Sequence, residues 1–160
     1  MPEMRLDHIA LLVNDLDAAV QTWRRLLAIL DPGQAERITY GEGTEGGEQM
    51  RWATFVNPGG CAIQLFEPLT EGGFLKKILA KRGESVHHVA FLSSDVDETC
   101  RELREAGFPL VQEQQTGPGT MPWLRWNFIA PGDATGVLVE VAQRYAVEGD
   151  RWVPVEGDPQ

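Results

Sequence analysis

Four polar side chains at repeat-related positions have the chemistry to hold a metal ion. His8 and His88 stand at the same place in two similar apolar segments, 80 residues apart. Gln64 and Glu140 each interrupt a later apolar run, CAIQLF and GVLVEVA, where an unpaired amide or charge is costly to bury. Two imidazoles, an amide oxygen and a carboxylate suit a divalent ion such as Co, Mn, Ni, Zn or Fe. The sequence therefore predicts one divalent metal site with open positions for water or substrate.

The two histidines begin two copies of one sequence unit. HIALLVNDLDAAVQTWRRLL matches HVAFLSSDVDETCRELREAG, with identities at His8/His88, Ala10/Ala90, Leu12/Leu92, Asp15/Asp95, Asp17/Asp97 and Arg24/Arg104. In each copy an apolar run predicts a buried strand, and Asp15 or Asp95 is expected to cap the amphipathic helix that follows. Gly107 is expected to end the second helix, because glycine enters the left-handed region without a Cβ clash.

Three strand-like segments follow each predicted helix. They cover residues 35–42, 49–57 and 60–67 in the first half, and residues 109–115, 123–130 and 136–143 in the second. Each half is thus expected to be a βαβββ module, over roughly residues 5–68 and 85–144, with a linker and short helix over 70–84. The predicted class is α+β: one domain, residues 1–145, whose two modules form a curved mixed sheet around the metal site. Residues 146–160 are expected to be a loosely held C-terminal tail.

Composition and charge narrow the classes of function. The chain has 160 residues and a net charge of −10, with 24 acidic and 14 basic side chains. This balance argues against nucleic-acid binding, which needs a basic face. No apolar run approaches the roughly 18 residues of a membrane span, and MPEMRLDHIA lacks the pattern of a signal peptide. We expect a cytoplasmic protein with no membrane partner, in which Cys61 and Cys100 are structural thiols.

The motifs around the four polar residues resemble those of the vicinal oxygen chelate superfamily. This superfamily includes glyoxalase I, extradiol dioxygenases, fosfomycin-resistance proteins and methylmalonyl-CoA epimerase. The resemblance covers roughly residues 5–144 and is carried by LDHIALLVNDLD with His8, AIQLFEPL with Gln64 and GESVHHVAFLSSDVD with His88. GVLVEVA with Glu140 is consistent with the fourth ligand. Glutamine at the second ligand position, the adjacent histidine pair and the LFEPL segment before a short helix favour the methylmalonyl-CoA epimerase branch.

The resemblance implies a metal-dependent isomerase or epimerase that acts on an acyl-CoA or small carboxylic substrate. In such enzymes the metal chelates two substrate oxygens and stabilises an enolate as a Lewis acid. Glu140 would be both a metal ligand and the catalytic base. A homodimer is implied by the resemblance alone.

The strand before Gln64 departs from the family pattern. In the epimerases a second base lies there in a segment like EQGVREAM, whereas this chain has EQMRWATF, with Trp52 at the position of the base. Glu48 lies on the same strand face but about 13 Å away at roughly 3.3 Å per residue, too far to replace it easily. Strand alternation places Trp52 on the metal side, and Trp52, Trp123 and Trp126 are expected to line the substrate pocket. Core packing is the alternative for Trp126.

The loss of the second base leaves several reactions open. It weighs against two-base epimerisation, but allows proton exchange without inversion, isomerisation or lyase chemistry. A glyoxalase I-type lyase needs the same metal and one strong base. A small-molecule-binding resistance or sequestration protein of the same fold would use the tryptophans, although such binders usually lack the metal ligands. Extradiol dioxygenase chemistry is disfavoured by Gln64, an additional ligand beside two histidines and one carboxylate.

Overall fold

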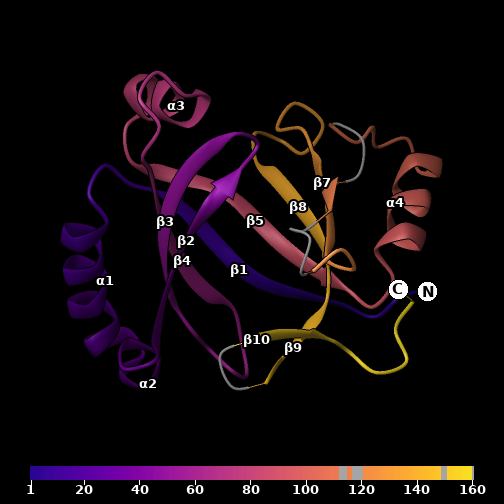
Figure 1. Ribbon diagram of the computed structural model, residues 1–160, viewed down its shortest axis with the longest axis horizontal. Coiled ribbons are helices and arrows are strands. Elements are labelled where there is room, and N and C mark those ends of the chain that lie inside the picture. Colours follow the sequence, from indigo (N-terminus) through magenta and orange to yellow (C-terminus); the bar gives the residue numbers. More distant parts are fainter. Residues whose placement is uncertain (112–114, 117–120, 149–150, 160) are drawn as a thin grey trace. The chain divides into compact units, whose positions relative to one another are not determined.

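The chain forms two compact units, each built on one βαβββ module. The computed structural model, shown in Figure 1, describes residues 1–111, 115–116, 121–148 and 151–159. One unit comprises residues 8–87, and the other comprises residues 1–7 and 88–160. In both units the sheet mixes parallel and antiparallel strand pairs. The prediction of a mixed α+β fold with two βαβββ modules is therefore confirmed.

The first unit runs from β1 to α3. Its elements are β1 (Met4–Leu12, of which residues 8–12 belong to this unit), α1 (Leu16–Leu30), α2 (Pro32–Ala35), β2 (Ile38–Glu45), β3 (Glu48–Phe55), β4 (Ala62–Pro68) and α3 (Phe74–Arg82). The strand order is β2-β3-β4-β1, and β4 runs parallel to β1. α1 begins where predicted, because the Asp15 carboxylate accepts a hydrogen bond from the Ala18 amide at 3.0 Å.

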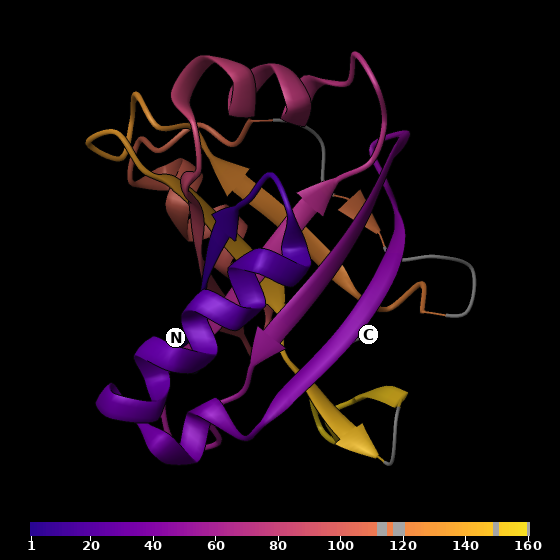
Figure 2. The same cartoon turned by 90° about the vertical axis from the view of Figure 1, so that its left-hand side faces the viewer.

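Different helices cover the two faces of this sheet. α1 lies across one face, as Figure 2 shows, and shares with it a core of Val13, Leu16, Val20, Leu27, Ala35, Ala53, Phe55 and Leu65. α3 covers part of the other face, where Leu75, Ile78 and Leu79 pack with Ala10, Leu12, Met50, Trp52 and Phe66. Because strand side chains alternate, the face under α3 is also the face that carries His8 and Gln64.

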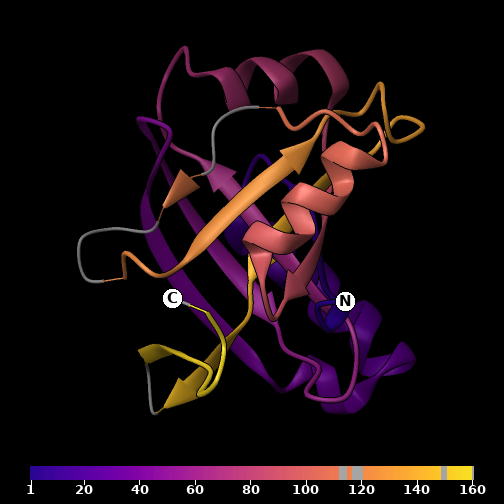
Figure 3. The same ribbon diagram turned by 90° about the vertical axis from the view of Figure 1, so that its right-hand side faces the viewer.

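The second unit repeats this plan. Its elements are β5 (Ser85–Ser93, of which residues 88–93 belong to this unit), α4 (Val96–Glu105), β6 (Gln115–Thr116), β7 (Arg125–Ile129), β8 (Leu138–Gln143), β9 (Tyr145–Glu148) and β10 (Arg151–Pro154). The order of its main sheet is β5-β8-β7-β6, and β8 runs parallel to β5. Figure 3 shows α4 in front of β7 and β8, where Val96 and Cys100 pack on Val141. The Asp95 carboxylate caps α4, and Gly107 follows the helix with a φ of 90°, both as predicted.

One hydrogen bond ties the last strand of each module to its helix. In the first unit the Glu67 carboxylate accepts from the Leu16 amide at 3.0 Å, at the start of α1. In the second unit the Gln143 side-chain oxygen accepts from the Val96 amide at 3.2 Å, at the start of α4. Each acceptor satisfies an amide that the helix itself leaves unpaired. The modules therefore share a connection between strand and helix as well as an order of elements.

Several predicted strands start or end elsewhere. The strand expected over 35–42 begins at Ile38, because Asp31 caps the short helix α2 and Pro32 starts it. The strand expected over 109–115 is reduced to a bridge between Leu110 and Ile129 and to β6, and residues 112–114 lie outside the described chain. β7 begins at Arg125 instead of residue 123.

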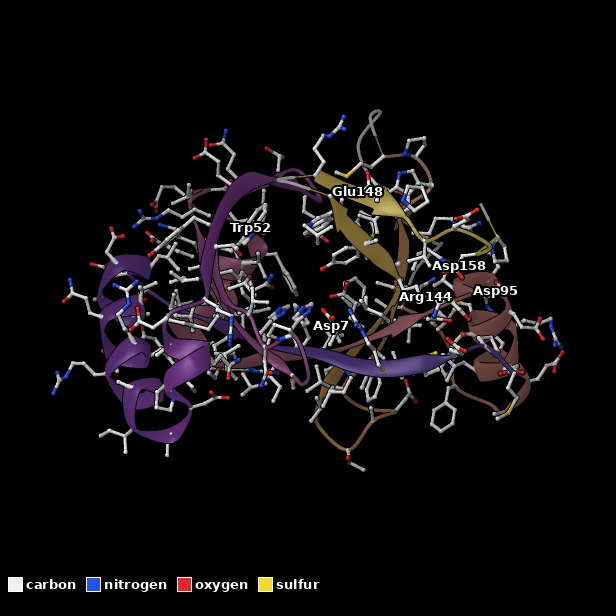
Figure 4. All side chains as sticks on the ribbon, turned by 90° about the horizontal axis from the view of Figure 1, so that it is seen from below. Asp7, Trp52, Asp95, Arg144, Glu148 and Asp158 are labelled. Carbon is white, nitrogen blue, oxygen red and sulfur yellow. The ribbon has the colours of Figure 1, made fainter. Side chains whose placement is uncertain are left out.

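The loosely held tail expected over 146–160 is wrong for most of its length. β9 and β10 form an antiparallel hairpin, in which the rings of Tyr145 and Trp152 stack with centroids 4.4 Å apart. Beyond the hairpin, Arg144 donates two hydrogen bonds to the Asp158 carboxylate at 2.7 and 2.8 Å. Figure 4 shows these two side chains side by side near α4. Among the helices described, none combines the length and the apolar character that crossing a bilayer requires.

Candidate metal centre

The first unit presents an imidazole and an amide on one face of its sheet. In the parallel ladder between β1 and β4, His8 pairs with Ala62 and Ala10 pairs with Gln64. Residues that pair across a ladder project to the same side, and side chains two positions apart do so too. His8 and Gln64 therefore share a face as diagonal neighbours, and both are half-buried.

The second unit presents an imidazole and a carboxylate in the same arrangement. His88 pairs with Leu138 and Ala90 pairs with Glu140, so the ligand candidates are again diagonal neighbours on one face. Here the two side chains touch, with His88 Nε2 3.1 Å from a Glu140 oxygen. Both side chains are largely shielded, at 11% and 17% exposure. Phe128 packs edge-on against the His88 ring, with centroids 6.4 Å apart.

These donor sets fit a divalent cation. Histidine nitrogens and carboxylate or amide oxygens are the ligands that borderline divalent metals take in proteins. A shielded carboxylate beside an imidazole is stabilised by a positive charge, which an ion or a proton on the histidine supplies. His87, one residue before His88, projects to the opposite side of β5, and its ring meets the Phe66 ring at 5.2 Å. The structure thus separates the two neighbouring histidines, as strand alternation predicts.

Trp52 projects from β3 on the face that carries Gln64. Trp52 pairs with Phe66 and Thr54 pairs with Gln64, so the predicted side of the sheet is confirmed. The indole lies against β2: a Cβ added to Gly41 would sit 2.5–2.6 Å from its ring atoms. Figure 4 shows Trp52 on the inner side of the curved β2–β3 hairpin. A glycine opposite Trp52 is therefore what lets the indole lie across the neighbouring strand.

Trp126 occupies the equivalent position in the second unit. It pairs with Ala142, two residues beyond Glu140, just as Trp52 pairs with the residue two beyond Gln64. Trp126 therefore lies on the Glu140 face. Sequence comparison missed this equivalence because the loops between the paired strands differ in length, so the two tryptophans precede their ligands by different intervals. Trp123 lies half-buried in the turn before β7 and belongs to no strand.

Comparison with known proteins identifies the family. The profile of the Glyoxalase/Bleomycin resistance protein/Dioxygenase superfamily matches residues 7–122. The chain belongs to this superfamily. An ethylmalonyl-CoA/methylmalonyl-CoA epimerase from Cereibacter sphaeroides is 32% identical over 145 residues, which cover 87% of this chain and 97% of that protein.

Solved epimerase structures share the fold of this superfamily member. Methylmalonyl-CoA epimerase from Mycobacterium tuberculosis is 34% identical, with a TM-score of 0.68 over 88% of each chain. A variant of Streptomyces coelicolor methylmalonyl-CoA epimerase, in complex with 2-nitronate-propionyl-CoA, is 34% identical, with a TM-score of 0.69 over 91% of this chain and 97% of that one. The resemblance inferred from the motifs is confirmed.

Glu48 has a structural task in this superfamily member. Its carboxylate accepts hydrogen bonds from the Phe74 amide and, at 3.2 Å, from the Leu75 amide, at the start of α3. The N-cap residue, Gly73, has no side chain that caps the helix, and a Cβ there would lie 2.6 Å from the Glu48 carboxylate. Glu48 therefore replaces the usual cap from a neighbouring strand. Its distance along β3 from the position of the base argues against Glu48 as a replacement, and its hydrogen bonds to α3 supply a second reason.

Two further groups shape the electrostatics of the units. In the second unit, burial raises the pKa of Tyr145, and the negative charges of Asp7 and Glu140 raise it further, against an opposing effect of Arg5. The phenol therefore stays protonated at neutral pH and can act as a donor. In the first unit, α3 contains all three lysines of the chain, Lys76, Lys77 and Lys81, followed by Arg82. This helix is basic in a protein whose net charge is −10.

Proposed function

We propose that the chain is a divalent-metal-dependent, epimerase-like enzyme that removes the proton next to the thioester carbonyl of an acyl-CoA. The proposed ligands are His8, His88 and Glu140, which would share one ion, with Gln64 as the fourth. The main support is the repeated register, which gives each module a histidine and an oxygen donor as diagonal neighbours on one face. When bound, the divalent ion would supply Lewis-acid stabilisation of charge on the substrate oxygens.

Glu140 is the proposed catalytic base. Its carboxylate is shielded, and one of its oxygens lies 3.1 Å from His88 Nε2, a contact that orients the group. A carboxylate fixed in this way pays less conformational entropy when it meets the substrate. Gln64 holds the equivalent position in the first module, but an amide cannot accept a proton at neutral pH.

We further propose that the reaction uses this single base. Trp52 takes the position of the second base and has no titratable group, while Glu48 is engaged at the start of α3. Proton removal and return would then occur from the same side of the substrate. The expected reaction is exchange of the α-proton with solvent, with inversion much slower than exchange.

The basic helix supports a CoA thioester over a free acid. The four positive charges of α3 stand against a charge of −14 on the remainder of the chain, since the net charge is −10. Lys76 pairs with Glu71 at 2.6 Å, whereas Lys77 and Lys81, one helical turn apart, are exposed. α3 packs on the face that bears His8 and Gln64, so its lysines are placed to attract the phosphates of a nucleotide arm. The related Streptomyces coelicolor epimerase binds a CoA derivative.

A single base and the same donor set also suit a glyoxalase I-type lyase. Turnover of methylglyoxal with glutathione, and no exchange in acyl-CoA esters, would favour this alternative.

A homodimer and a cytoplasmic location stay predictions, and light scattering of the purified protein tests the first.

The decisive experiment is deuterium exchange. The Mn- or Co-loaded protein is incubated with methylmalonyl-CoA in D2O, and deuterium at the α-carbon is followed by mass spectrometry, with metal content measured in parallel. Exchange is expected in the native chain, with slow inversion on chiral analysis. His88→Ala is expected to lose most bound metal and exchange, whereas His87→Ala, on the opposite side of β5 from His88, keeps both. No exchange by a metal-loaded protein that binds the ester would overturn the proposal.

A further inference from the structure

The indole nitrogen of Trp126 is a buried donor with no acceptor among the described residues. The nitrogen is shielded from solvent. An indole nitrogen can only donate, so no rearrangement of its own proton satisfies it. A buried donor that forms no hydrogen bond destabilises the folded chain, and buried polar groups are therefore nearly always paired. The unpaired Trp126 N–H therefore indicates a partner other than the residues that the structure describes.

The position of Trp126 indicates what that partner is. Its cross-strand neighbour is Ala142, and the next pair along the ladder is Phe128 with Glu140. Trp126 and Glu140 are thus diagonal neighbours on one face, about 7–8 Å apart at their backbones and within reach of an aromatic side chain. A molecule that lies against Glu140 on this face also lies beside the indole.

The neighbouring Arg125 also has two buried nitrogens, Nε and Nη2, with no partner among the described residues. It alternates to the face that α4 covers, where its Nη1 pairs with Asp97 at 2.5 Å, so it does not face Glu140. Trp52, at the equivalent position of the first module, differs from Trp126 in another way. Its ring lies against the backbone of β2, within 2.6 Å of where a Gly41 Cβ would stand. Trp52 therefore acts through its shape, whereas Trp126 adds a hydrogen-bond donor.

We propose that the Trp126 indole N–H donates a hydrogen bond to a carboxylate oxygen of the substrate, and so positions a malonyl-type acid for Glu140. This inference rests on the proposed function, because it places the substrate against the Glu140 face. An ionised oxygen is the acceptor that gains most from a shielded N–H. The preferred substrates are then acyl-CoA esters that carry a carboxylate on the α-carbon, and propionyl-CoA, which lacks it, is disfavoured.

The test uses malonate as a probe of the Zn-loaded full chain. With nitrogen-15 in the five tryptophans, NMR resolves the indole N–H signals, and Trp126→Phe identifies one by its loss. Malonate is expected to shift the Trp126 signal downfield. Trp126→Phe keeps a ring but removes the donor, and is expected to weaken malonate binding about tenfold or more in calorimetry. Trp23→Phe is the control, because Trp23 belongs to α1 and packs against the core between that helix and the opposite face of the first sheet.

Each outcome decides between the two proposals. Unchanged malonate affinity in Trp126→Phe, with an unmoved Trp126 signal in the native chain, overturns this inference and leaves the proposed function standing. If the native chain binds neither malonate nor methylmalonyl-CoA, the proposed function is overturned, and this inference with it. If Trp126→Phe does not fold, the signal of the native chain still decides. A kinetic readout agrees if the variant raises the KM for methylmalonyl-CoA and leaves the KM for propionyl-CoA unchanged.

Discussion

The two modules use one scaffold with opposite placements of charge. In the first module the candidate ligand is an amide, Gln64, and the side chain three residues later that accepts from the helix amide is a carboxylate, Glu67. In the second module the order is reversed: Glu140 carries the charge, and Gln143 accepts from the helix. Either group satisfies a helix amide, because both offer an oxygen acceptor. At the ligand position only the carboxylate can take a proton, so the scaffold is shared while the proposed base belongs to the second module.

The largest expected effect tests that assignment of the base. Glu140→Gln gives the second module the amide that the first already has, and should lower exchange by about 10²–10⁴-fold while an oxygen ligand remains. Gln64→Glu, the reverse change in the first module, should leave exchange within about tenfold. Deuterium exchange and metal analysis of both variants provide the comparison. Equal losses in the two variants would mean that both side chains act only as ligands.

The next expected effect concerns the helix connections. Gln143 is fully buried, accepts from Val96 and donates to the Ser94 carbonyl at 3.0 Å. Gln143→Ala leaves these groups without partners and should lower the free energy of unfolding by about 1–3 kcal/mol. Glu67→Gln imitates the second module and should cost less, because the amide oxygen still accepts from Leu16 and the lost ion pair with Arg51 is partly exposed.

Chemical denaturation of Gln143→Ala and Glu67→Gln measures how much each variant lowers the free energy of unfolding. A Glu67→Gln variant that is less stable than Gln143→Ala would show that the ion pair, and not the hydrogen bond to the helix, dominates in the first module. That result would break the structural equivalence of the two connections.

Much of the scaffold, and the sheet face on which each candidate ligand lies, was predictable from local pattern. The recurrence of His8 as His88 indicated that the second module repeats the first 80 residues later. Alternation of side chains along the strands then placed Trp52 on the Gln64 face. What the sequence could not predict depends on contacts between distant segments. Capping of α3 by Glu48 joins residues 26 positions apart, and no local pattern marks it. The β9–β10 hairpin was missed because its strands are short, lie in a polar segment and show no clear alternation of apolar and polar residues. The stacking of Tyr145 on Trp152 helps to stabilise this hairpin, and such a contact cannot be recognised from a local pattern.

A smaller expected effect tests how Trp52 is held. Gly41→Ala places a Cβ within 2.6 Å of the indole, so the ring must move, with a loss of about 1–3 kcal/mol of stability. Gly43→Ala is the matched control, because its Cβ would lie 3.3 Å from the nearest indole atom. Chemical denaturation should show a larger loss of stability in Gly41→Ala than in Gly43→Ala, and tryptophan fluorescence should report a changed environment of the indole in Gly41→Ala. Equal stability of both variants would show that the indole adapts to the added methyl group, and that Gly41 is not what holds Trp52 in place.

The smallest expected effect concerns the charge that distinguishes α3 from α4. α3 carries four basic and no acidic side chains, whereas Asp97, Glu98, Glu102 and Glu105 lie along α4. If α3 attracts the phosphates of CoA, reversing Lys77 and Lys81 together should raise the KM for methylmalonyl-CoA about three- to tenfold at low salt, and less as salt screens the charges. The KM for the corresponding pantetheine ester, which lacks the nucleotide, should stay unchanged. Reversing Arg24 and Arg25, which are exposed on α1, makes the same change in net charge on the other face of the sheet. An equal rise in that control would assign the effect to net charge, and would leave the basic helix without a part in substrate selection.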